Sequence, residues 1–201
     1  MARLENKVVL ISGGASGIGA DTARFVVREG GKAAIADRDE AKGRALAAEL
    51  GEAALFVSLD VRQEAQWQKA VADTAARFGG LHGLLNAAGV GVRNDIETCT
   101  LEEYRRVNDI NSMGTFLGCK HAVPAMKASG GGAIVNISSG TYRMGRPWFL
   151  HYVSTKASLA GMSRSLAREL GPHGITVNTV LPGVVLHGIQ SNRLPEDYKK
   201  M

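Results

Sequence analysis

Three residues of this sequence have types and spacing that suit proton transfer: Ser139, Tyr152 and Lys156. Tyr152 and Lys156 are four residues apart, and residues at that spacing lie on the same face of a helix. A free phenol has a pKa of about 10, and a cation close to it lowers such a pKa by about 1–3 units. We therefore expect Lys156 to lower the pKa of Tyr152 and to prepare its hydroxyl for proton transfer.

The same three residues also suit an ordinary strand, loop and helix. Ser139 precedes Gly140, which is common in turns without any chemistry, and one tyrosine–lysine pair arises readily by chance. The chemical interpretation therefore depends on what the rest of the chain places around this group.

The segment SGGASGIG at residues 12–19 directly follows an apolar run and carries Gly13, Gly17 and Gly19 in a G-x-x-x-G-x-G pattern. Glycines at a strand-to-helix turn let the backbone N–H groups approach a pyrophosphate at the positive end of the helix. Some turns of this composition serve only for packing, so the pattern alone is ambiguous.

Asp37 ends the second apolar run, 24 residues after Gly13. A carboxylate at that place accepts hydrogen bonds from a ribose diol and repels a 2′-phosphate, which favours NAD over NADP. Arg38 keeps the NADP alternative open. Asp37 or Asp39 is equally suited to cap the helix that follows.

Short apolar runs alternate with amphipathic segments along the chain. This alternation predicts the strands and helices that position these residues. Gly and Pro punctuation separates them, and six strands alternating with helices imply a parallel sheet covered on both faces. We predict an α/β, doubly wound, Rossmann-like fold for residues 1–201 as one domain. The predicted strands are 7–12, 32–37, 54–60, 81–89, 132–138 and 174–183, and the main helices are 20–31, 39–50, 63–78, 101–128 and 152–170.

Two local signals refine the longest predicted helix. Thr100 followed by Glu103 has the pattern of a capping box and predicts that the helix begins there. Pro124 predicts a kink or marks the last turns.

Composition excludes several classes of protein. The chain has 201 residues, of which 45% are hydrophobic and 21% charged, with a net charge of +5. Its basic residues are interleaved with acidic ones, which argues against nucleic-acid binding. No apolar run approaches the roughly 18 residues of a membrane span, and we expect a cytoplasmic protein. Two distant cysteines and scattered histidines predict neither a disulfide nor a metal site.

Taken in order, these motifs resemble the short-chain dehydrogenase/reductase family along essentially the whole chain. The resemblance rests on SGGASGIG, the pair Asp60–Val61, NAAG at 86–89, Asn111 in NDINSMGTF, NISS at 136–139 with YVSTK at 152–156, and LPG at 181–183. It implies hydride transfer between a nicotinamide cofactor and a secondary alcohol or ketone.

The resemblance also implies residue roles. Tyr152 would exchange the proton with the substrate oxygen, Ser139 would hydrogen-bond that oxygen, and Asn111 would hold a water that relays the proton. Ser138 is the alternative serine. Neighbouring strand residues face opposite ways, and the 13-residue separation of Ser139 from Tyr152, which is the family's commonest, implies that Ser139 is the catalytic one. Cofactor binding would fall to Ser12, Gly13, Ser16, Gly17, Ile18, Gly19, Asp37, Asp60, Val61, Asn86, Ala87, Gly89, Tyr152, Lys156, Pro182, Gly183 and Val185.

The chain departs from the family pattern in several places. Ser12 replaces a threonine, Ala87 replaces an asparagine, and His187 stands near the usual carboxamide-binding threonine. We also expect the sheet to lack the family's last strand, which leaves strand six at an edge.

Substrate choice is predicted to lie in loops at about 89–99, 140–151 and 183–201. Met144, Trp148 and Phe149 suggest an apolar wall, and Arg143 or Arg146 suits an anionic group. The family resemblance implies a homodimer or homotetramer through helices 101–128 and 152–170. A catalytically silent dinucleotide-binding or scaffold protein is the alternative function.

Overall fold

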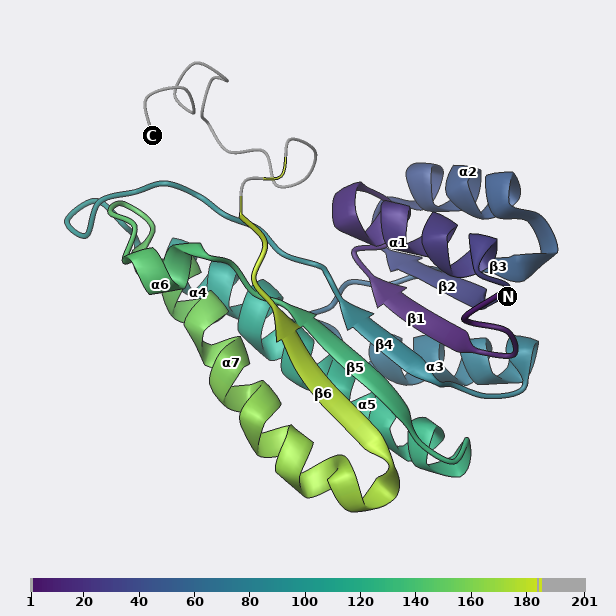
Figure 1. Cartoon of the computed structure of the whole chain (residues 1–201). Helices are drawn as coiled ribbons and strands as arrows, with labels where there is room; N and C mark the ends of the chain where they lie inside the picture. The colour runs from purple at the N-terminus through teal and green to yellow at the C-terminus, as the bar shows by residue number, and fades with distance from the viewer. Residues whose placement is uncertain (1, 184, 186–201) are drawn as a thin grey trace.

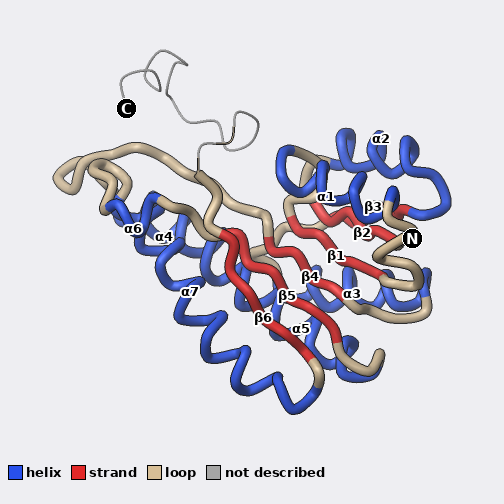
Figure 2. The backbone as a smooth tube through the Cα atoms, viewed as in Figure 1, coloured by secondary structure: helices blue, strands red, loops and turns tan. Residues whose placement is uncertain are grey.

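The computed structural model describes residues 2–183 and 185. Its centre is a parallel sheet of six strands in the order β3-β2-β1-β4-β5-β6, which Figures 1 and 2 show edge to edge. The strands are β1 (Val8–Ser12), β2 (Lys32–Asp37), β3 (Ala54–Ser58), β4 (Gly83–Asn86), β5 (Gly132–Ile137) and β6 (Ile175–Val180).

Helices cover both faces of the sheet, as predicted. In Figure 1, α1 and α2 lie on one face, and α3, α5 and α7 lie on the other. The helices are α1 (Gly17–Arg28), α2 (Glu40–Leu50), α3 (Glu64–Phe78), α4 (Leu101–Asn108), α5 (Gly114–Ala128), the short α6 (Thr141–Met144) and α7 (Leu150–Leu170).

The apolar runs of the strands explain this layering. Along β1, Leu10 and Ile11 point to opposite faces and are both fully buried. Leu10 joins a core cluster that includes Trp67 of α3, and Ile11 joins a separate cluster with Ala23 of α1. Because each face is covered by helices, a strand here must be apolar on both sides.

The strand order places the glycine loop beside the loop that follows β4. β2 and β3 lie on one side of β1, and β4, β5 and β6 lie on its other side. Where the strand order reverses in this way, a crevice opens at the carboxyl ends of the strands. Gly13 has a φ of +68°, and a Cβ on it would lie 2.7 Å from the Cα of Ala88. This close approach requires glycine.

The predicted helix 101–128 is α4 and α5 joined by a π-helical turn at Asp109–Met113. Thr100 accepts the N–H of Glu103 at 3.1 Å, which confirms the predicted start. The Glu103 carboxylate instead accepts the side-chain amide of Asn94 at 2.8 Å. Pro124 lies within the last turns of α5.

At the other boundaries the predictions differ by up to three residues; the helix predicted at 20–31, for example, is Gly17–Arg28. α7 begins at Leu150 rather than at residue 152, so the predicted catalytic tyrosine lies inside its first turn. β6 pairs only with β5 among the residues that the structure describes and forms an edge of the sheet, as predicted.

Candidate active site

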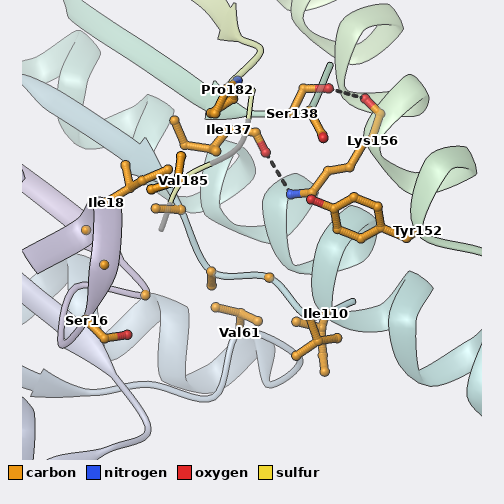
Figure 3. Close-up of a pocket in the computed structure, with 18 of the residues that line it drawn as sticks. Ser16, Ile18, Val61, Ile110, Ile137, Ser138, Tyr152, Lys156, Pro182 and Val185 are labelled. Carbon is orange, nitrogen blue, oxygen red and sulfur yellow. Dashed lines mark hydrogen bonds between the residues drawn. The ribbon is translucent and has the colours of Figure 1, made fainter. Parts of the chain in front are cut away.

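A cavity of about 570 Å³ opens at the carboxyl ends of the strands and brings most of the predicted site together. Figure 3 shows Ser16 and Ile18 on its α1 side, with Tyr152 and Lys156 on its α7 side. The predicted residues that line it are Gly13, Ser16, Gly17, Ile18, Gly19, Asp37, Asp60, Val61, Ala87, Gly89, Ser139, Tyr152, Lys156, Pro182, Gly183 and Val185.

Ser12, Asn86 and Asn111 do not line the cavity among the described residues. Ser12 and Asn86 are both buried. The Asn86 amide donates to Asn136 Oδ1 on the neighbouring strand at 2.9 Å. The Asn86 side chain is thus used in a bond to β5, and contacts of Ser12 and Asn86 with a cofactor stay a prediction.

The glycine loop forms a cradle that fits a pyrophosphate. Ser16 is the N-cap of α1, and its side chain makes no capping hydrogen bond within the described part of the chain. A Cβ on Gly19 would lie 2.1 Å from the carbonyl oxygen of Gly13, so no side chain is compatible with this packing. The N–H groups of the first helical turn remain available to an anion.

Asp37 lies on the wall of the same cavity at the end of β2. Its Oδ2 accepts the N–H of Ala15 at 3.0 Å, and its Oδ1 accepts the N–H of Asp39 at 3.0 Å. Asp39, not Asp37, caps α2, because its Oδ1 accepts the N–H of Lys42 at 3.1 Å. Asp37 is thus held by the glycine loop while keeping lone pairs for a ribose diol.

Asp60 and Arg62 form an ion pair, and both residues line the cavity. Arg62 Nε donates to Asp60 Oδ1 at 2.9 Å. The hydrogen bonds from Arg62 lower the pKa of Asp60 below its ordinary value, although partial burial opposes them. Arg38 lines the same end of the cavity.

Ser139 is oriented by a residue that the motifs did not identify, Thr141. Ser139 Oγ accepts the N–H of Thr141 at 3.2 Å and its hydroxyl at 2.9 Å. Ser139 Oγ is the acceptor in both bonds, so the hydroxyl proton of Ser139 can be donated to a different group. Ser139 also hydrogen-bonds the side chain of Tyr152. No motif marks Thr141; its place two residues after Ser139 in a predicted substrate loop was the available signal.

The Ser138 side chain is used in a bond to the backbone of α7. Its hydroxyl donates to the carbonyl oxygen of Lys156 at 2.6 Å, a bond drawn in Figure 3. Ser138 therefore fastens β5 to α7, and Ser139 is the serine that meets Tyr152.

Lys156 is almost completely buried, and its Nζ donates to the carbonyl oxygen of Ile137 at 2.7 Å. Burial lowers the pKa of Lys156 to about 8, because a desolvated ammonium is disfavoured. The ammonium lies 5.7 Å from the centroid of the Tyr152 ring.

The expected lowering of the Tyr152 pKa by Lys156 is not found. Burial raises the pKa of the Tyr152 phenol above its ordinary value, and the hydrogen bond with Ser139 opposes this shift. The physical reason is that desolvation penalises the phenolate, while the lysine directs its nitrogen to a backbone carbonyl.

Asn111 lies in the π-helical turn and is fully buried. Its Oδ1 accepts the N–H of Val90 at 2.8 Å. Its Nδ2 donates to the carbonyl of Val90 at 2.9 Å and to Thr155 Oγ1 at 3.1 Å. The side chain therefore joins three segments, and the role of Asn111 in holding a relay water stays a prediction.

Only some of the residues that we predicted to contact the substrate line the cavity. Met144, Arg146 and Phe149 line the cavity, together with Arg93, which the sequence did not single out. Trp148 is 59% exposed, and neither it nor Arg143 is among the described lining residues. His187 and most of the loop at 183–201 lie outside the described residues.

A Rossmann-type sheet with a glycine cradle and a Ser–Tyr–Lys group at opposite sides of one cavity defines a nicotinamide-dependent oxidoreductase. A family model described as short chain dehydrogenase matches residues 7–197. The chain belongs to this family. It is an oxidoreductase that interconverts alcohol and carbonyl groups, and the scaffold alternative has no support.

Similar proteins cover most of the chain. A 3-alpha-(or 20-beta)-hydroxysteroid dehydrogenase of Mycobacterium tuberculosis is 45% identical over 97% of this chain and 75% of that protein. A trans-4-hydroxycyclohexanecarboxylate dehydrogenase of Sinomonas cyclohexanicum is 42% identical over 91% of this chain and 74% of that protein. The crystal structure of 3-ketoacyl-(acyl-carrier-protein) reductase from Brucella melitensis complexed with NADH has a TM-score of 0.89 at 33% identity, covering 92% and 78% of the two chains.

Within the described residues, no helix has the length and apolar character of a transmembrane segment.

The buried ammonium of Lys156 predicts a specific dependence of stability on pH. Its pKa is about 8 in the folded chain against an ordinary value of 10.5. Between these values the unfolded chain binds the proton and the folded chain does not, so the free energy of unfolding gains a contribution that rises with pH. Denaturation in urea at about pH 7 and about pH 9.5 measures it.

In Lys156→Met this rise is expected to disappear, while Lys127→Met, which changes an exposed lysine, keeps it. Equal pH dependence in the wild type and Lys156→Met contradicts the assignment.

Proposed function

We propose that this protein is an NAD-dependent dehydrogenase or carbonyl reductase of cyclic secondary alcohols and ketones, with Tyr152 as its general acid and base. The observation that carries the proposal is the group formed by Ser139, Tyr152 and Lys156. It is buried at one side of a cavity whose other side is the glycine cradle.

A nicotinamide cofactor bound in this cavity would supply the hydride chemistry at the substrate carbon. Tyr152 exchanges the proton with the substrate oxygen. Ser139, whose acceptor sites are used by Thr141, donates its proton to that oxygen and holds it in place. Lys156, which lines the cavity, would hold the ribose hydroxyls of the cofactor.

Burial of the Tyr152 phenol determines whether its hydroxyl is protonated when no substrate is bound. Because the pKa of Tyr152 is raised, its hydroxyl carries a proton at neutral pH. Carbonyl reduction requires this protonated form, whereas alcohol oxidation requires its loss and is favoured as pH rises.

NAD is the proposed cofactor, because Asp37 lies where the adenine ribose binds in this fold. A carboxylate there accepts bonds from the ribose diol and repels a 2′-phosphate. Arg38 and Arg62 line the same end, but Arg62 is paired with Asp60, which reduces the attraction for a further phosphate.

The cyclic nature of the substrate is inferred from the relatives. They are named for hydroxysteroids, for a hydroxycyclohexanecarboxylate and for a dichlorocyclohexadiene diol. Apolar residues on the α7 side of the cavity, including Met144 and Phe149, suit a hydrocarbon ring.

We also propose that residues 1–201 form one domain, and that the protein assembles as a homodimer or homotetramer through α4, α5 and α7. Large apolar side chains are exposed along these helices and the π-helical turn: Leu101, Tyr104, Met113, Phe116 and Leu150. Exposed apolar side chains in such number favour a protein interface. A cytoplasmic location stays a prediction.

Replacing Phe116 by Asp is expected to shift the protein toward smaller species in sedimentation equilibrium, because a charge is buried without a partner at the proposed interface. Phe25→Asp is the matched control, since Phe25 is similarly exposed but lies on α1. An unchanged mass for Phe116→Asp argues against this interface.

Tyr152→Phe tests the proposed acid and base. We expect at least a 100-fold loss of kcat, in line with the usual contribution of a general acid or base of about 10²–10⁴. NADH affinity, measured by fluorescence titration, is expected to change little because the ring remains. Substantial activity in this variant with any ketone that the wild type reduces refutes the assignment.

Asp37→Ala tests the cofactor preference. Removing the carboxylate is expected to weaken NADH binding and to strengthen NADPH binding, and the ratio of the two dissociation constants reports the change. Asp39→Ala removes a neighbouring carboxylate that caps α2, and it is expected to leave that ratio near the wild-type value. A wild type that binds NADPH more tightly overturns the choice of NAD.

A further inference from the structure

A cation lies beside the proposed reaction site and has no role in the mechanism above. Arg93 comes from the loop after β4 and lines the cavity. Its Cζ lies 5.7 Å from the centroid of the Phe149 ring. The Phe149 ring in turn lies 5.1 Å from the Tyr152 ring, centroid to centroid. Two successive ring contacts therefore connect the guanidinium to the proposed acid and base.

The backbone on both sides of Arg93 is held in place. Val90 is bound at its N–H and its carbonyl by the buried amide of Asn111. The N–H of Asn94 donates to the carbonyl of Trp148 at 2.9 Å. These bonds attach the loop to the π-helical turn and to the segment before α7, so the position of Arg93 is defined by the fold.

The charges around Arg93 favour an anionic ligand. Arg93 forms no ion pair with an acidic side chain in the part of the chain that the structure describes. The described residues that line the cavity include two carboxylates, Asp37 and Asp60, and both belong to the proposed cofactor end. The charge of Arg93 therefore lies next to the apolar surface of Phe149.

We propose that the substrate carries a carboxylate, separated by an apolar body from the alcohol or ketone carbon, and that Arg93 binds this carboxylate while Tyr152 meets the reacting oxygen. A guanidinium stacked on an aromatic ring keeps its N–H edge free, and that edge matches a carboxylate with two parallel hydrogen bonds. Phe149 and Met144 provide the apolar surface for the body between the two groups.

This inference rests on the proposed function, since it names the substrate class of the same site. It goes further because it predicts discrimination between an acid and its neutral ester, which a purely apolar pocket does not provide. The apolar wall alone predicts that the ester binds as well as the acid.

The first experiment measures binding without turnover. Cyclohexanecarboxylate and its methyl ester are titrated calorimetrically into the full-length protein saturated with NADH. We expect the wild type to bind the acid about 10- to 100-fold more tightly, the range given by one charged hydrogen-bonded contact. Arg93→Met is expected to remove this preference while leaving NADH affinity unchanged.

Arg143→Met is the matched control, because Arg143 is exposed and is not among the described lining residues. It is expected to keep the wild-type preference. Arg93→Lys keeps the charge without the planar fork, and a partial preference is expected. Equal affinity of the wild type for acid and ester overturns the proposal, as does a full preference in Arg93→Met.

The second experiment follows reduction of 4-oxocyclohexanecarboxylate and its methyl ester at 340 nm. Arg93→Met is expected to raise KM for the acid about 10- to 100-fold with little change in kcat, and to leave the ester within about twofold. Absence of turnover with both ketones counts against the proposed function. The preference for the acid over the ester in the calorimetric titration tests the role of Arg93 independently of turnover.

Discussion

The buried side-chain amide of Asn111 holds together the parts of this protein that surround the cavity. Its bonds to Val90 and Thr155 connect the π-helical turn, the loop after β4 and α7. Thr155 lies between Tyr152 and Lys156 in sequence, so one amide connects α7 to the loop that carries Arg93. A buried polar group of this kind must find partners, and these partners define the geometry of the site. A π-helical turn is a frequent feature of functional sites.

Burial determines the electrostatics of the group that this junction positions. It raises the pKa of the Tyr152 phenol and lowers the pKa of the Lys156 ammonium, because water no longer stabilises either charge. The hydrogen bond to the Ile137 carbonyl satisfies Lys156, and Ser139 satisfies Tyr152. The free protein therefore keeps the proton on the phenol, which is the form that donates to a carbonyl oxygen.

The parallel sheet places the Ser139, Tyr152 and Lys156 group apart from the glycine cradle. All strands end at the same edge, so the glycine cradle after β1 and the serine after β5 open into one cavity although more than a hundred residues separate them. The glycine loop is compressed against the loop after β4, where Gly13 meets Ala88.

The sequence by itself determined the fold class, the family, and most residues of the cavity, because strand alternation, glycine spacing and the Tyr-x-x-x-Lys pair are local patterns. The family resemblance also favoured Ser139 over Ser138, through the separation of Ser139 from Tyr152, while strand alternation implied that the two serines face opposite ways. Tertiary structure decided the rest. The positions of Ser12 and Asn86, the orientation of Ser139 by Thr141, the direction of the Tyr152 pKa and the proximity of Arg93 to Phe149 depend on which distant segments meet. Burial and hydrogen-bond partners arise only when the segments pack, and no local pattern encodes them.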